Sequence, residues 1–194
     1  AGISRKNPNR NYTDPWPKPE LICALTEFRA LCGFAEPAQA VAVLGELGVP
    51  QLDHYLALLA GQMDAEGTRA LFSTLITIPQ GAVAQVLDAV LAACVQKVRE
   101  GSSPHVAHYR IALDLAERYP GDAGVLASLM LNEVTPQPGQ ALYLHAGNMH
   151  AYLSGTGVEI MGNSDNVLRG GLTPKHVDVP ELMRVLDFSP GPVQ

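Results

Sequence analysis

The segment 145–153 holds the residues with the clearest potential for metal chemistry. It contains His145 and His150 and lies in a turn between two expected strands. A neutral imidazole that projects from such a turn can bind zinc. Taken alone, a histidine in a strand-rich region is more often a hydrogen-bonded structural residue, so that interpretation leads until other residues support a metal site.

The segment 16–20 could place a cation beside a carboxylate. Its prolines alternate with Lys18 and Glu20 and hold the chain extended. Residues two positions apart in an extended chain project to the same side, so the two charges are expected together. A metal ligand beside a cation for phosphate binding or proton transfer would need such rigidity. The alternative is a proline-rich surface loop with solvated charges, which the residue types alone favour.

The segment 163–175 resembles an anion-binding loop. Gly170 and Gly171 let the backbone approach a ligand, and Arg169 and Lys175 flank them. The sequence contains neither the P-loop pattern nor the glycine pattern of dinucleotide-binding folds. Nucleotide-binding folds therefore have no support.

The composition is that of a folded globular protein. Hydrophobic residues make up 47% and charged residues 16% of the 194 residues, which excludes a disordered tail or a fibrous repeat. The net charge of -6 argues against nucleic acid as a partner. Cys23, Cys32 and Cys94 lie in apolar surroundings, which fits reduced core thiols. Apolar stretches are interrupted before membrane-spanning length, so we expect no membrane and a cytoplasmic location.

Residue periodicity predicts an α+β protein with a helical middle and antiparallel strands after residue 132. The clearest helical pattern runs from Val83 to Val98, where apolar residues line one face and polar residues the other. Short apolar runs between Pro, Gly and Asn turns predict the strands. We expect helices over 37–47, 52–59, 64–76, 83–98 and 104–119, a shorter one ending at 131, and a last one over 179–186 capped by Asp178. We expect strands within 21–31 and over 134–135, 141–144, 152–153 and 158–161.

Three motifs, in order along almost the whole chain, resemble those of type I mannose-6-phosphate isomerases. The first is Trp-Pro-Lys-Pro-Glu at 16–20, followed by Ala-Leu-Thr at 24–26 and Ala-Leu-Cys-Gly-Phe at 30–34. The second is Ala-Gly-Asn-Met-His-Ala-Tyr-Leu at 146–153. The third runs from Gly-Val-Glu-Ile-Met at 157–161 through Asp-Asn-Val-Leu-Arg-Gly-Gly-Leu-Thr-Pro-Lys at 165–175. A helical stretch separates the first two, as in that family.

The resemblance implies an α+β fold in which part of a cupin-type antiparallel β-barrel carries an inserted helical domain. We accordingly expect an incomplete N-terminal loop and barrel strands at 1–34, the helical insertion at 35–131, barrel strands with the metal and substrate motifs at 132–176, and a helix leading toward a further domain at 177–194. The family has a barrel portion before the first motif and continues beyond the last helix. The chain thus resembles the middle of such an enzyme.

The resemblance also implies a zinc-dependent isomerase that interconverts mannose 6-phosphate and fructose 6-phosphate through an enediol. The family holds one zinc with Gln, His, Glu and His, of which Glu20 and His150 match. The other two ligands come from a Gln-x-His string, and nothing before Tyr12 has it. A family-typical His before the Lys-Pro-Glu is Pro17 here. With two of four ligands, we expect the isolated chain to be inactive.

Roles for five further residues follow from the same resemblance. Arg169 is implied to be the catalytic residue at the reacting carbons, and Lys18 to support proton transfer or charge. Lys175 is implied to face the phosphate. Tyr152 and Glu159 are implied to line the substrate pocket.

Two interpretations other than the isomerase stay open. The chain could be a non-catalytic sugar-binding or protein-interaction module, which would need neither a metal nor Arg169. Alternatively, a barrel portion on a separate or cleaved polypeptide could complete the site by assembly. An incomplete barrel exposes edge strands, so self-association is expected. The isomerase interpretation requires Glu20, His150 and Arg169 to meet in one pocket.

Overall fold

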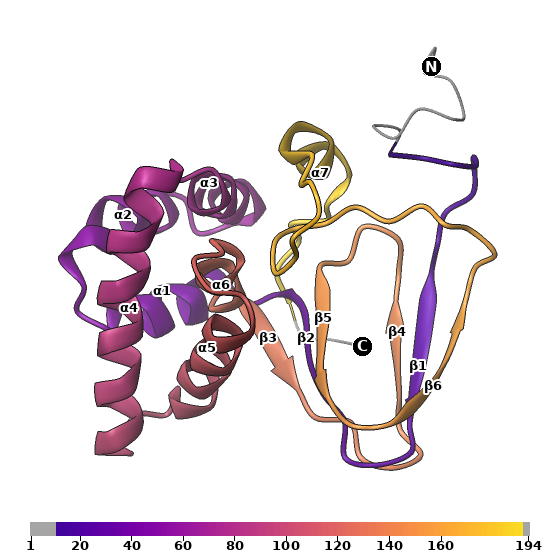
Figure 1. Ribbon diagram of the computed structural model, residues 1–194, viewed down its shortest axis with the longest axis horizontal. Coiled ribbons are helices and arrows are strands. Elements are labelled where there is room, and N and C mark those ends of the chain that lie inside the picture. The colour runs from indigo at the N-terminus through magenta and orange to yellow at the C-terminus, as the bar shows by residue number, and fades with distance from the viewer. Residues whose placement is uncertain (1–10, 192–194) are drawn as a thin grey trace.

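The computed structural model describes residues 11–191, which form a helical half and a strand half (Figure 1). The helical half lies between β2 and β3 in the sequence, and α7 returns to lie between the two halves. In chain order the helices are α1 (Pro37–Gly45), the short 3-10 helix η1 (Pro50–Leu52), α2 (Asp53–Gly61), α3 (Ala65–Ile76), α4 (Gln80–Glu100), α5 (Val106–Arg118), α6 (Gly124–Ser128) and α7 (Val179–Val185).

The strand half consists of two three-stranded antiparallel sheets, which confirms the mixed α+β class. One sheet has the order β4-β1-β6 and the other the order β3-β2-β5. The strands are β1 (Glu20–Ala24), β2 (Arg29–Phe34), β3 (Leu131–Val134), β4 (Ala141–Leu144), β5 (His150–Ser154) and β6 (Gly157–Met161). The expected cupin-type barrel stays a prediction.

Residue alternation decides which face of the first sheet is buried. Ile22 of β1 pairs with Leu142 of β4, and both are buried. The next pair toward the start of β1 is Leu21 with Tyr143, and Tyr143 is 54% exposed. Because successive side chains of a strand point to opposite faces, one face of this sheet packs inward and the other faces solvent.

Strand β2 is buried on both faces because it separates two hydrophobic cores. Ala30 and Cys32 belong to the smaller core between the sheets. Leu31 and Phe34 belong to the core of the helical half. A register shift between Leu31 and Phe34 in the pairing with β3 lets these two side chains face the same core.

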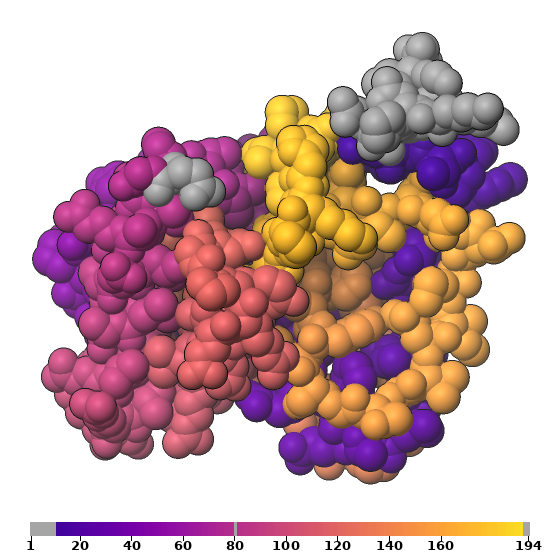
Figure 2. All heavy atoms as spheres, viewed as in Figure 1, coloured from indigo at the N-terminus to yellow at the C-terminus, as the bar shows by residue number. Residues whose placement is uncertain are grey.

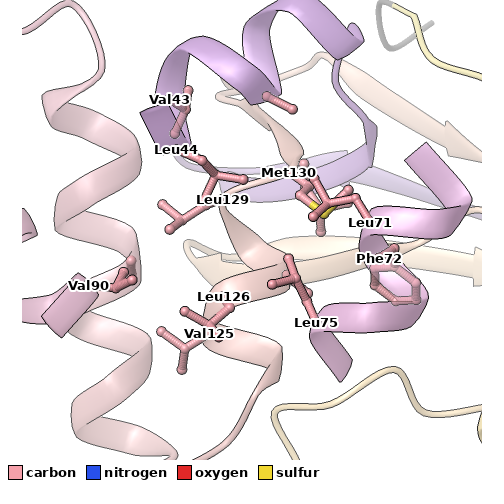
Figure 3. Packing of buried hydrophobic residues seen from close by; sticks show 14 of the residues in the cluster. Val43, Leu44, Leu71, Phe72, Leu75, Val90, Val125, Leu126, Leu129 and Met130 are labelled. Atoms are coloured by element: carbon pink, nitrogen blue, oxygen red, sulfur yellow. The ribbon is translucent and has the colours of Figure 1, made fainter. Parts of the chain in front are cut away.

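The helical half packs around α6, which is buried along its whole length (Figure 3). Val125 and Leu126 of α6 are 0% exposed and lie among apolar side chains of α1, α3 and α4. Tyr109 of α5 is also fully buried, and its hydroxyl donates to the Val43 carbonyl at 2.9 Å and to Glu46 Oε2 at 3.0 Å. These bonds satisfy the one polar atom that the tyrosine brings into the core. The neighbours labelled in Figure 3 are Val43, Leu44, Leu71, Phe72, Leu75, Val90, Leu129 and Met130.

Helix α4 is amphipathic, as its periodicity predicts. It packs against α5. Its inward face supplies Val83, Val86, Leu87, Val90 and Cys94. The segment Gly81–Glu100 is also long and apolar enough to cross a membrane, and 28% of its most apolar window is buried. One such helix is weak evidence for a membrane span, because core helices of soluble proteins have the same length and composition.

Several element boundaries differ from the sequence prediction, and two of the differences arise at residues that pair with β2. The helix predicted to end at 131 ends as α6 at Ser128, because Leu131 already pairs with Phe34 in the second sheet. His150 is the first residue of β5 and not part of the turn before it, because it pairs with Cys32 of β2. Both differences arise from pairing with a distant strand, which overrides the local pattern.

The last helix confirms its predicted start. The Asp178 side chain accepts a hydrogen bond from the Glu181 amide at 3.1 Å, and Pro180 lies in the first turn, where its missing amide has no cost. Helix α7 ends at Val185, one residue before the predicted end.

Candidate functional site

A cavity of about 760 Å³ lies where the strand half meets the helical half. Its walls come from the starts of β1 and β5, the turn before β5, the loop 166–175, the end of α5 and helix α7. Figure 2 shows the strand half hollowed, with the early chain visible behind the later strands. Six of the predicted site residues line this cavity: Lys18, Glu20, His150, Tyr152, Arg169 and Lys175.

Glu20 contacts two basic side chains in the cavity wall. Its Oε1 lies 3.0 Å from Nζ of Lys18, and its Oε2 lies 3.1 Å from Nε2 of His150. The Glu20 side chain is 12% exposed, so both contacts are largely shielded from bulk water. Lys18 and Glu20 project together, as expected for an extended proline-rich segment. The structure also brings His150 to the same carboxylate.

The backbone of the preceding turn orients the His150 ring. Nδ1 of His150 lies 3.0 Å from the carbonyl oxygen of Asn148. Because a carbonyl can only accept, Nδ1 donates and Nε2 is left to face Glu20. Histidines that bind metals are commonly oriented in this way. His145, the other histidine of the segment, has its Nε2 3.6 Å from Asp187 instead.

Tyr152 and Glu159 form a hydrogen-bonded pair beside His150. The Tyr152 hydroxyl donates to Glu159 Oε1 at 2.6 Å, and the rings of Tyr152 and His150 lie 5.5 Å apart. Burial, followed by the neighbouring Glu159 carboxylate, raises the pKa of Tyr152 above its usual value. The phenol therefore stays protonated at neutral pH. Glu159 is absent from the described residues that line the cavity and meets the lining through its bond to Tyr152.

Arg169 and Lys175 bring positive charge to the cavity from the loop 166–175. Neither has a carboxylate within ion-pair distance among the residues that the structure describes. The loop can pack closely against α6 because Gly171 has no side chain: with φ at +118°, a Cβ there would lie 2.8 Å from Cα of Gly124. Unpaired cations in a concave surface favour an anionic ligand.

The sequence did not single out Arg118, which lines the same cavity from the end of α5. Its guanidinium donates to the Leu153 carbonyl at 3.4 Å. A basic residue in the last turn of a helix is ordinary, because it faces the negative end of the helix dipole. The local sequence therefore gives no signal of its place in the cavity. Tyr12 and Asn166 also line the cavity and were not singled out.

Glu20 and His150 are the residues that could hold a metal ion. Within residues 11–191, no third His, Cys, Asp or Glu completes a metal-binding group. Zinc sites use three protein ligands when catalytic and four when structural. Cys32 pairs with His150 across the strands, but its buried thiol donates to Asn148 Oδ1 at 3.4 Å. The described residues therefore do not fit a complete zinc site.

Known proteins of similar sequence and fold establish the relationship of this chain to a family. No protein-family model matches the sequence. The mannose-6-phosphate isomerase of Escherichia coli is 39% identical over 194 residues, which cover 99% of this chain and 47% of that protein. The mannose-6-phosphate isomerase of Bos taurus is 37% identical over 194 residues, which cover 95% and 46%. The chain is homologous to type I mannose-6-phosphate isomerases.

Solved structures of mannose-6-phosphate isomerases share the fold of this chain. A crystal structure of a mutant phosphomannose isomerase from Salmonella typhimurium superposes with a TM-score of 0.83 at 36% identity, covering 98% of this chain and 46% of that one. A zinc-bound mannose 6-phosphate isomerase gives a TM-score of 0.81 at 36% identity, with the same coverage of 98% and 46%. The resemblance that the motifs indicate is thereby confirmed. The chain spans about half the length of the curated mannose-6-phosphate isomerases that it matches.

Proposed function

We propose that this chain carries the sugar-phosphate-binding part of an isomerase that interconverts mannose 6-phosphate and fructose 6-phosphate. The observation that supports it is the convergence of Lys18, Glu20, His150 and Arg169 on one cavity, in a chain homologous to such enzymes. In this proposal the two antiparallel sheets are part of a cupin barrel, and α1 to α6 are its inserted helical domain.

The cations and the phenol of the cavity have separate roles in binding the substrate. Lys175 neutralises the phosphate, because it is one of the unpaired cations in the loop 166–175. Tyr152 stays protonated and contributes a polar group to the sugar pocket. Arg169 lies at the reacting carbons, and its guanidinium stays charged throughout the pH range of the reaction.

The proposed reaction moves the hydrogen on C2 of the aldose to C1 as a proton. The C1 carbonyl becomes a hydroxyl and the C2 hydroxyl becomes a carbonyl through a cis-enediol, so no other reactant is consumed. Arg169 stabilises the negative charge that develops on the two oxygens. Lys18, held 3.0 Å from Glu20, supports this charge or the proton transfer.

We propose Glu20 and His150 as two zinc ligands of this isomerase site. The residues described in the structure supply no others, so no catalytic step is assigned to the metal in this chain. We expect the chain by itself to show no turnover. Robust turnover by the chain alone would contradict the assignment of only two ligands.

A reducing, cytoplasmic location belongs to the same proposal. Cys32 and Cys94 are buried and free, and Cys23 is free as well. Burial raises the pKa of Cys94 to about 12, so this thiol is protonated and unreactive. Free buried thiols are typical of proteins from reducing compartments.

A chimaera tests the proposed function directly. This chain would replace the matched part of the Escherichia coli relative, to which it is 39% identical. We expect the chimaera to convert mannose 6-phosphate to fructose 6-phosphate, and Arg169→Ala to lower its kcat by about a thousandfold. Arg110→Ala, an exposed arginine of α5 outside the cavity lining, is the matched control and should keep full activity. A folded chimaera without turnover would refute the proposal.

The alternative is a non-catalytic module that binds a sugar or a partner protein. The observation that favours it is that Glu20 and His150 are only two ligands among the described residues, whereas a catalytic zinc site has three protein ligands. Such a module would tolerate Glu20→Ala and His150→Ala without loss of ligand affinity. In the isomerase chimaera, either substitution should abolish turnover.

A further inference from the structure

The Asp14 carboxylate ties together two loops that no helix or strand holds. Residues 12–19 and 162–178 have no regular secondary structure. Oδ1 of Asp14 accepts hydrogen bonds from the Trp16 amide and from Ser164 Oγ, both at 2.9 Å. Oδ2 accepts from the Asp165 amide at 3.3 Å. One carboxylate thus joins the loops directly.

Asn166 completes this junction from the other side. Its Nδ2 donates to the carbonyl oxygens of Asp14 and Trp16 at 2.9 and 3.0 Å, and its Oδ1 accepts from the Thr13 amide at 2.8 Å. Ser164 is 8% exposed, so part of the junction is buried. The prolines of the first loop have no amide hydrogen and cannot form a strand ladder. Side-chain hydrogen bonds replace backbone pairing here.

Each loop carries a cation of the cavity just beyond this junction. Lys18 lies two residues after Trp16 and Arg169 lies three residues after Asn166. The first loop also bonds to the start of the second, because the Gly162 amide donates to the Pro19 carbonyl at 2.9 Å. Both cations therefore lie within three residues of the same set of hydrogen bonds.

We propose that Asp14 is a positioning residue that fixes Lys18 and Arg169 at the cavity for a bound sugar phosphate. The inference rests on the proposed function. Asp14 is absent from the described residues that line the cavity, so it acts through the loops and not by touching the ligand. Its hydrogen bonds, first that from the Trp16 amide, lower the pKa of Asp14, so at neutral pH it is an anion that only accepts.

Asp14→Ala and the milder Asp14→Asn test this in the 194-residue chain. The measurements are the affinities for mannose 6-phosphate and for mannose by calorimetry, and the NMR amide signals of Lys18 and Arg169. We expect Asp14→Ala to weaken mannose 6-phosphate binding by about tenfold, with a smaller effect on mannose. Asp14→Asn should lie between Asp14→Ala and the wild type. Both amide signals should shift.

Asp64→Ala is the matched control. The Asp64 carboxylate also accepts two backbone amides, those of Glu66 and Gly67, but it caps α3 outside the cavity lining. Its removal should lower thermal stability and leave both the affinity and the two amide signals unchanged.

Two results would overturn the inference. The first is wild-type affinity for mannose 6-phosphate in a folded Asp14 variant. The second applies if the wild-type chain itself binds no mannose 6-phosphate: the proposed function then fails separately, and the NMR signals alone test the role of Asp14. Unchanged Lys18 and Arg169 signals in the variants would then overturn it.

Discussion

At the scale of single residues, the site depends on a contact between the first residues of two strands. Glu20 begins β1 and His150 begins β5, and their side chains lie 3.1 Å apart. Lys18 contacts the other carboxylate oxygen at 3.0 Å. A carboxylate has acceptor sites on both oxygens, so Glu20 can hold the cation and still face His150. Removing Glu20 would therefore affect both neighbours.

We predict weak zinc binding by this chain. Two ligands should give a dissociation constant of about 10 µM or weaker at pH 7, because zinc sites of high affinity have three or four. His150→Ala should remove this binding. His54→Ala, at an exposed position of α2, is the control and should leave it unchanged. Calorimetry measures both, and nanomolar affinity would contradict the prediction.

At the scale of elements, the N-terminal loop and α7 are joined by carboxylates near the cavity. The Tyr12 hydroxyl donates to Glu181 Oε1 at 2.5 Å, and Asn11 Nδ2 donates to Asp178 Oδ2 at 2.7 Å. Arg184 pairs with the same Glu181. The bonds from Arg184 and then Tyr12 lower the pKa of Glu181 to about 2. Hydrogen bonds lower the pKa of Asp178 as well.

We predict that acid releases this loop before the helical core unfolds. A carboxyl group with a lowered pKa contributes stability that is present above its ordinary pKa and lost as the pH falls through its folded-state pKa. For Glu181 this range runs from 4.5 down to about 2. Trp16 is the one tryptophan of the chain, so its fluorescence anisotropy reports on the loop. It should fall in this range while the helical circular dichroism persists.

Glu181→Gln tests whether protonation of Glu181 causes the release of the loop. Its anisotropy should already be lower at neutral pH, because the charged contacts with α7 are gone. Loss of anisotropy and of helical signal at the same pH in the wild-type chain would contradict the prediction.

At the scale of the whole molecule, three aromatic rings join the halves. Phe188 follows α7 and stacks on Phe34 of β2 with ring centroids 5.0 Å apart. It also lies 5.9 Å from Phe72 of α3. Phe188 is 7% exposed, so the segment after α7 is anchored in the helical core beside β2.

We predict that Phe188→Ala destabilises the whole chain by about 3 to 5 kcal/mol, the usual cost of truncating a buried phenylalanine. An alanine at this position has no ring to pack against Phe34 and Phe72, so the joint between the halves is weakened. Urea unfolding measures the free energy, and Phe188→Leu is the control that keeps most of the apolar volume. A destabilisation below about 1 kcal/mol for the alanine variant would contradict the role of this anchor.

We predict that the chain self-associates through the exposed apolar face of the first sheet. Leu21 lies between Tyr143 and Ile160 in the sheet register, and Ile160 is 70% and Val158 53% exposed. Exposed apolar patches and edge strands both favour contact with another chain. Ile160→Lys should shift the chain toward monomer in analytical ultracentrifugation. Met63→Lys, at an exposed apolar residue of the helical half, is the control. Equal association of both variants would exclude this face.

Local patterns predicted most of the helices and several strand positions. The apolar face of α4 and the cap of α7 at Asp178 are set by residues within a few positions of one another. The predictions failed where a distant strand decides the conformation, as at Leu131 and His150. The position of Arg118 in the cavity lining was not predicted for the same reason. It depends on contact with β5, which the residues near Arg118 in the sequence do not indicate.

The sequence by itself determined the helical segments, the turns and, through three ordered motifs, the relationship to the isomerases. It also indicated that Lys18 and Glu20 project together, because that depends on local chain extension alone. Only the tertiary structure decided that Glu20 faces His150 and that Asp14 bonds to Ser164. Such contacts depend on which strands pair and in which register. That choice follows from the free energy of the whole packed core and not from neighbouring residues.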